Sequence, residues 1–233
     1  MRYLIVAYIM LFWMPATQAQ KYELGPYLGG SNFIGDVGAT TYIRPNSLAI
    51  GGIAKWNRSP RHSWRASLIY TDLKANDAKS NQERRVDRGY SFSNKLLELT
   101  LGMEFDFWEY DIYLRDPGVV PYLSTGISTI LTHEMYLDDN DDVIRPNKRK
   151  VGFALPMIIG AKTRINRTIN LGFEIGARMS FYNSLDGSES VEITKSKPDK
   201  SPAFGNSNQF DWYMFTGITL TFAFGENPCY DVY

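Results

Sequence analysis

The chain has 233 residues, a length that fits a single domain because all-β barrels and sandwiches often run past about 200 residues undivided. Basic and acidic residues balance at 25 each and no charged run dominates, which argues against nucleic acid as a partner. Hydrophobic residues make up 44% of the chain, yet the mean hydropathy is -0.28, so most apolar residues are interleaved with polar ones.

The N-terminus reads "MRYLIVAYIMLFWMPATQAQ" and has the parts of a secretory signal peptide. Arg2 precedes an apolar core over residues 3–14, and Pro15 and Ala19 follow it. The apolar core is shorter than the roughly 20 residues that a membrane helix needs, which disfavours a retained anchor helix. We therefore predict a signal peptide at residues 1–19 and export of the rest of the chain.

Most of the mature chain shows period-2 alternation, which places successive side chains on opposite faces of a strand. In "LLELTLGMEFDF", apolar side chains from Leu97 to Phe107 share one face, and the other face holds polar side chains and Gly102. The segments "INLGFEIGARMSF" and "DWYMFTGITLTFAF" repeat this pattern. We predict strands at about 21–31, 47–57, 63–73, 93–107, 119–132, 151–165, 169–181 and 209–224.

The polar face of these strands decides between a soluble sandwich and a barrel. It is rich in glycine and carries isolated charges of both signs, which suits the packed lumen of a small barrel where acid pairs with base. We predict an all-β fold over residues 20–224, an eight-stranded antiparallel transmembrane β-barrel of the outer-membrane type whose last strand closes against the first. The predicted lumen charge network consists of Glu23, Lys55, Arg65, Glu98, Glu104, Asp106, Lys162, Arg164, Glu174, Arg178 and Asp211.

The connections between the predicted strands alternate in length. Those at 58–62, 108–118 and 166–168 are shorter, and those at 32–46, 74–92, 133–150 and 182–208 are longer. Outer-membrane barrels have short turns in the periplasm and long loops outside, so both termini and a C-terminal tail at 225–233 are predicted to be periplasmic. The tryptophans fit two membrane interfaces, with Trp56, Trp64 and Trp108 near the short turns and Trp212 near the opposite rim.

Groups suited to catalysis or metal binding are few. His133 and Glu134 follow one another on the fifth predicted strand and would point to opposite faces, so we predict no lipid-modifying or other enzyme and no cofactor. The "DDNDD" run from Asp138 to Asp142 lacks the glycine and glutamate of an EF-hand loop. A solvated outer loop is favoured there over a calcium site, and no metal is predicted.

Cys229 is the only cysteine, so an internal disulfide is excluded. The residue follows Pro228, which ends the last predicted strand, and export would place it in an oxidising compartment. Two interpretations stay open at this point: an idle surface thiol and a bond to another molecule.

Four segments together resemble one family. They are "LGPYLGGSNFIGDVG" (24–38), "KWNRSPRHSWRASLIYTDLKANDA" (55–78), "RGYSFSN" (88–94) and "DWYMFTGITLTFAFGENPCY" (211–230). The chain resembles the PorG-type outer-membrane β-barrel of the Bacteroidota type IX secretion system. The loops at 134–150 and 182–208 carry the least resemblance.

The resemblance implies a non-catalytic outer-membrane component of protein secretion and gliding motility. Such a protein anchors a periplasmic ring, built from a lipoprotein and its partner subunit, through periplasmic turns and the C-terminal tail. The residues implied in partner binding are Cys229, Tyr230, Trp56, Arg58, Arg61 and His62, with an intermolecular disulfide at Cys229 as one hypothesis. The alternative is an OmpA-like general structural barrel or surface adhesin that acts through its outer loops.

Overall fold

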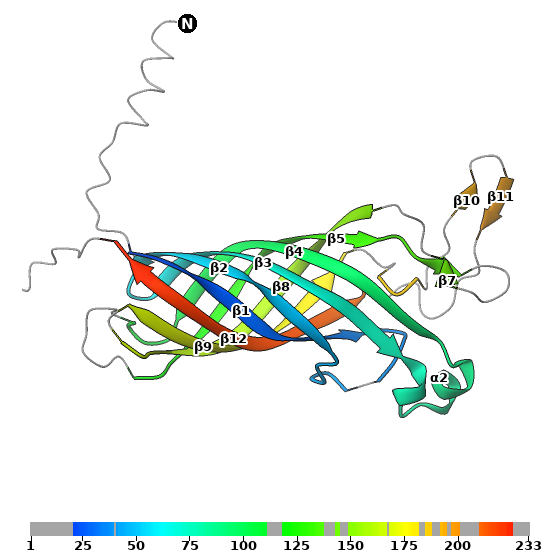
Figure 1. The fold of residues 1–233 in the computed structure, drawn as a ribbon, viewed down its shortest axis with the longest axis horizontal. Helices are drawn as coiled ribbons and strands as arrows, with labels where there is room; N and C mark the ends of the chain where they lie inside the picture. The colour runs from blue at the N-terminus through cyan, green and yellow to red at the C-terminus, as the bar shows by residue number, and fades with distance from the viewer. Residues whose placement is uncertain are drawn as a thin grey trace, which may run out of the picture.

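The computed structural model describes residues 21–39, 41–110, 118–137, 143–144, 149–166, 168–181, 185–187, 192–194, 197–200 and 210–225. Its main feature is a closed antiparallel barrel of eight long strands, drawn in Figure 1 with its axis nearly horizontal. The predicted signal peptide, the tail with Cys229 and Tyr230, and the aspartate run Asp138 to Asp142 all lie outside the described residues.

The long strands follow one another around the barrel in chain order. They are β1 (Lys21–Ile34), β2 (Ser47–Ser59), β3 (His62–Asn76), β4 (Ser91–Asp106), β5 (Val120–His133), β8 (Arg149–Arg164), β9 (Ile169–Ser180) and β12 (Trp212–Phe224). The strand β12 closes the barrel against β1, in a register that runs from Tyr22↔Phe224 to Ile34↔Trp212. The predicted eight-stranded barrel, and its closure by the last strand, are confirmed.

One end of the barrel, here named the turn end, carries the connections from β2 to β3, from β4 to β5 and from β8 to β9. The first residue of β1 and the last residue of β12 lie at the same end, on the left of Figure 1. The opposite end, named the loop end, carries the connections that follow β1, β3, β5 and β9. The connections therefore lie at the two ends as the sequence predicts. The predicted difference in length fails at one place, because β1 extends to Ile34 and the connection at 35–46 is no longer than the one at 107–119.

The loop end holds short elements that the sequence did not predict. The connection from β3 to β4 forms the 3-10 helix η1 (Asp77–Lys79) and the helix α2 (Glu83–Arg88). Two small hairpins pair β6 (Tyr136–Leu137) with β7 (Val143–Ile144) and β10 (Glu192–Thr194) with β11 (Lys197–Lys200). These elements are too short to produce a recognisable hydrophobic period, which explains why sequence reasoning missed them.

The outward faces of the long strands are apolar and exposed. Leu48, Leu101 and Ile127 are 66%, 60% and 65% exposed, although each lies within a strand of the barrel wall. Water disfavours a continuous apolar surface of this kind, whereas the hydrocarbon core of a bilayer requires it. The closed barrel leaves no sheet edge unpaired, as a bilayer also requires, so the protein is a barrel of the outer-membrane type. Among the described residues, no helix has the length and apolarity needed to cross a membrane.

Aromatic side chains mark both ends of this apolar surface. At the turn end, the rings of Tyr22 and Phe224 stack at 5.9 Å, and Trp56 lies opposite Trp64 on the neighbouring strand. At the loop end, Phe181 and Phe210 meet edge to face at 5.8 Å. Aromatic rings prefer the interface between hydrocarbon and water, so the two groups indicate where the bilayer begins and ends.

Candidate functional site

The lumen near the turn end contains a network of buried charges centred on Glu104. Its carboxylate is 2.8 Å from Lys55 Nζ, 2.7 Å from Lys162 Nζ and 3.4 Å from Arg65 Nη1. These partners come from β2, β8 and β3, and every side chain in the group is almost fully buried. Lys162 also lies 2.8 Å from Asp106, so one lysine joins two carboxylates.

Arg65 extends the network across the lumen to Glu174 on β9. The guanidinium makes two contacts of 2.8 Å with the Glu174 carboxylate, the paired geometry that binds carboxylates most strongly. The Tyr122 hydroxyl donates to the same carboxylate at 2.8 Å. On the other side, Glu23 accepts hydrogen bonds from Asn57 and Thr221. Strands far apart around the barrel are thus tied together through its interior.

A second group of charges lies nearer the loop end. Arg178 places its Nε 3.3 Å from Glu98 Oε1 and its guanidinium carbon 4.4 Å from the centre of the Phe215 ring. Tyr213 and Thr100 donate hydroxyl hydrogen bonds to the Glu98 carboxylate. Beyond this group, towards the loop end, the lumen is filled by an apolar cluster that includes Phe33, Leu73, Phe92 and Leu96.

Two predicted lumen residues lie at the margins of the network. Arg164 is half-buried at the turn-end limit of β8, opposite Asn170 on β9. Asp211 is buried at the loop end, where its carboxylate accepts the Leu185 backbone N–H at 3.1 Å. The other nine predicted residues are 5% exposed or less and line the interior.

Tyr110, which follows β4, closes the lumen at the turn end. Tyr110 is 4% exposed, its hydroxyl donates to Asn170 Oδ1 at 2.8 Å, and Lys162 Nζ lies 4.6 Å from the centre of its ring. Burial, above all, raises the pKa of the Tyr110 hydroxyl above its usual value, which favours the neutral form that donates to Asn170. The side chains filling the lumen make the interior a packed core, which does not suit a diffusion channel.

The turn from β2 to β3 presents three of the predicted partner-binding residues. Arg58, Arg61 and His62 are all exposed. The Ser59 hydroxyl accepts the backbone N–H groups of His62 at 3.0 Å and Arg61 at 3.4 Å, which fixes the turn. The Pro60 carbonyl accepts the Tyr110 N–H at 2.8 Å, so this turn is joined to the residue that closes the lumen.

A surface hollow of about 460 Å³ brings Arg58 and His62 together. Trp64 and Met103 complete its wall, and Trp64 is 51% exposed. The sequence did not indicate Trp64 or Met103 as contact residues. Alternation assigns such apolar side chains to one face of a strand and gives no sign of a hollow beside them. Trp56, the remaining predicted contact residue within the described part of the chain, lies in the outward aromatic group instead.

The two residues considered for catalysis, His133 and Glu134, have structural partners in the fold. Glu134 is buried and lies 3.0 Å from Lys150 Nζ, while the His133 backbone bonds with the Asn94 side chain. Within the described ranges, no group of three or more His, Cys, Asp or Glu residues has an arrangement that could hold a metal ion.

The fold and the filled lumen define the class of this protein as an eight-stranded barrel of the outer-membrane type. The chain belongs to the family described as "Domain of unknown function (DUF6089)", whose model matches residues 2–233. No curated protein matches the chain.

Several solved structures have some likeness to the chain over most of its length. The N-terminal β-barrel domain of Pseudomonas aeruginosa OprF is 11% identical with a TM-score of 0.42, covering 89% of this chain and 98% of that one. Neisserial surface protein A is 10% identical with a TM-score of 0.45, covering 88% of this chain and 97% of that one. The attachment invasion locus protein Ail of Yersinia pestis, in complex with the heparin analogue sucrose octasulfate, is 8% identical with a TM-score of 0.43, covering 89% and 99%.

Proposed function

We propose that this protein is a non-catalytic outer-membrane component of the type IX secretion system. In this proposal it anchors the periplasmic lipoprotein ring of the machine to the outer membrane, through its turn end and its C-terminal tail. The four sequence segments that resemble PorG-type barrels suggest the machine. The observation that carries the anchoring role is the exposed surface formed by Arg58, Arg61 and His62 at the turn end, with its backbone held by Ser59. Arg61 also lies 3.7 Å from the exposed Glu109 carboxylate, which leaves Arg58 as the other arginine of this surface.

The position of the chain ends supports docking at this surface. Phe224, the last residue of β12, lies at the turn end beside Tyr22, so the tail at 225–233 leaves the barrel there. An exported barrel with short turns in the periplasm would present both features to a periplasmic partner. The basic side chains would then meet acidic groups of the ring lipoprotein or its partner subunit, and Cys229 would be within reach of a thiol of that complex.

The filled lumen supports an anchor over a channel. A buried charge network that connects β2, β3, β4, β8 and β9 stiffens the barrel and leaves no wide path through its centre. A stiff barrel is suited to hold a large periplasmic assembly at a fixed place in the membrane.

Charge reversal at the turn end tests the docking surface. The double variant Arg58→Glu and Arg61→Glu, expressed in the native bacterium, should lose co-purification of the ring lipoprotein and lose secretion of substrates by this machine. The matched control is Arg84→Glu on α2, an exposed arginine at the loop end, which should retain both. Normal secretion and normal co-purification in the double variant would reject the docking surface.

A non-reducing gel of native outer membranes tests the role of Cys229 separately. If Cys229 binds the ring covalently, a band heavier than the monomer should vanish with reductant and in the Cys229→Ser variant. Mass spectrometry of that band would identify the partner. A monomer in every lane would exclude the disulfide and leave the charged surface as the anchor.

A further inference from the structure

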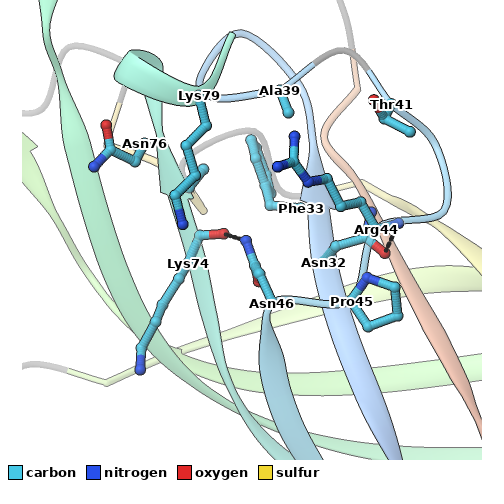
Figure 2. A pocket seen from close by; sticks show the side chains of 11 residues that line it. Asn32, Phe33, Ala39, Thr41, Arg44, Pro45, Asn46, Lys74, Asn76 and Lys79 are labelled. Atoms are coloured by element: carbon cyan, nitrogen blue, oxygen red, sulfur yellow. Dashed lines mark hydrogen bonds between the residues drawn. The ribbon is translucent and has the colours of Figure 1, made fainter.

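The loop end contains a cavity of about 280 Å³ that none of the functions above uses. It lies between the connection from β1 to β2 and the end of β3 with η1 (Figure 2). Figure 2 shows Arg44 and Lys79 on either side of Phe33, while Lys74 extends down along the barrel wall. The cavity is therefore framed by two segments that are distant in sequence, with cationic side chains on both.

Hydrogen bonds hold the frame of this cavity in place. Asn32 is 3% exposed, donates to the Tyr42 carbonyl at 2.8 Å and accepts the Arg44 backbone N–H at 3.4 Å. Asn46 donates its side-chain amide to the Lys74 carbonyl at 2.8 Å, which links the two segments directly. The backbone that carries Arg44 is thus held in place, which reduces the backbone ordering needed on binding.

The charge of the cavity is positive and uncompensated. Its lining includes Arg44, Lys74 and Lys79 and contains no acidic side chain. Within the part of the chain that the structure describes, no ion pair engages these three cations. The nearby Asp77 carboxylate is already occupied, because it pairs with Arg88 at 2.7 Å and accepts the Gly38 N–H at 2.8 Å. An anion is the occupant that this arrangement favours.

The size and shape of the cavity restrict the anion further. A volume of about 280 Å³ exceeds that of a bare phosphate ion and fits a phosphate attached to one sugar ring. A guanidinium binds phosphate oxygens through two parallel hydrogen bonds, and a lysine adds a point charge. The amide of Asn46, besides its bond to the Lys74 carbonyl, and the hydroxyl of Thr41 at the cavity wall are suited to sugar hydroxyls.

We propose that this cavity binds a phosphorylated sugar group. Lys74 lines the edge of the cavity on the outward side of β3, and its side chain extends down along the wall (Figure 2), where it can meet a second phosphate of a membrane glycolipid. Two kinds of ligand carry a phosphorylated sugar: a soluble sugar phosphate, and a glycolipid whose head group lies in the leaflet at the loop end. The experiment separates these sources.

The soluble source is tested with the complete mature barrel in detergent micelles, titrated calorimetrically with glucosamine 1-phosphate and with glucosamine. The phosphorylated probe should bind and the neutral sugar should not. Arg44→Gln and Lys79→Gln should each weaken binding by about tenfold, because each removes a charge-assisted hydrogen bond to phosphate. Arg84→Gln, an exposed arginine on α2 outside the cavity, is the matched control and should bind as the wild type does.

The membrane source is tested with nanodiscs that contain either diphosphorylated lipid A or its dephosphorylated form. Retention of the phosphorylated lipid during purification, lost in Arg44→Gln and Lys74→Gln but not in Arg84→Gln, would assign the site to a glycolipid. Weakening of glucosamine 1-phosphate binding by Arg44→Gln, with no lipid preference, would assign it to a soluble ligand. Two results would overturn the proposal: binding of neither phosphorylated probe, or equal losses in Arg84→Gln and Arg44→Gln. Neither test requires the secretion machine, so failure here leaves the proposed anchoring role untouched.

Discussion

Replacing Glu104 by glutamine should destabilise the barrel more than any other change of a single charge in its lumen. The substitution keeps the shape of the side chain and removes the carboxylate that contacts Lys55, Arg65 and Lys162. Arg65 keeps Glu174 as a partner, and Lys162 keeps Asp106. Lys55 loses its ion-pair partner, because the structure pairs it with Glu104 among the described residues.

The size of the expected loss of stability follows from the burial of the Glu104 and Lys55 side chains. The Glu104 side chain is 0% exposed and that of Lys55 is 3% exposed, so water cannot replace the lost partner. Removing one member of a buried ion pair costs about 3–5 kcal/mol, whereas replacing both members by neutral groups costs much less. The double variant Glu104→Gln and Lys55→Met should therefore recover about 1–2 kcal/mol of the loss, since it also removes the uncompensated lysine.

Urea unfolding of the barrel in lipid vesicles measures these changes in unfolding free energy directly. Glu104→Gln should shift the transition to lower urea, and the double variant should shift it part of the way back. Gel migration of unheated samples gives an independent readout of the folded barrel. A Glu104→Gln barrel that unfolds within about 1 kcal/mol of the wild type would refute the assignment of Glu104 as the centre of the network.

Three further predictions concern the barrel wall, the second charge group and the loops. Gly126→Ala should cost about 1–3 kcal/mol in unfolding free energy, because its Cβ would lie 2.2 Å from a carbonyl oxygen of β4. Gly52→Ala, with its nearest atom at 3.8 Å, should be nearly neutral in the same urea assay. Arg178→Met should lower the temperature at which the folded band disappears from the gel, since Glu98 is left buried without its arginine; unchanged migration at all temperatures would contradict this. Deleting residues 182–208 should spare secretion if the protein is an anchor and abolish surface adhesion if it is an adhesin, which a secretion assay and a cell-binding assay distinguish.

The predictions about local structure rest on the alternation of apolar and polar residues along each strand. This alternation can be recognised without knowing the fold. Alternation at period 2 assigns each side chain of a strand to one of two faces, whatever the strand packs against. For this reason Glu104 and Arg65 were assigned to the lumen, and Leu101 to the membrane face, from the sequence alone. The strong final strand also predicted closure against β1, since unpaired backbone groups are not tolerated in lipid.

The sequence alone did not show which charged residues pair with one another. Glu104 meets Lys55 and Lys162 across sequence separations of 49 and 58 residues, and the register around the closed barrel sets which of several acids each lysine reaches. Nothing in the sequence indicated that Tyr110 is buried. This residue lies in an irregular connection, and its burial depends on the neighbouring turn from β2 to β3.

The sequence by itself therefore determined the strands, their faces and the kinds of side chain inside the barrel, because these depend on interactions between residues close along the chain. Only the tertiary structure decided which charges meet at Glu104, that Trp64 joins Arg58 in one hollow, and that Arg44 faces Lys79 across a cavity. These contacts depend on strand register and loop packing, which are fixed only when segments distant in sequence come together in the closed barrel.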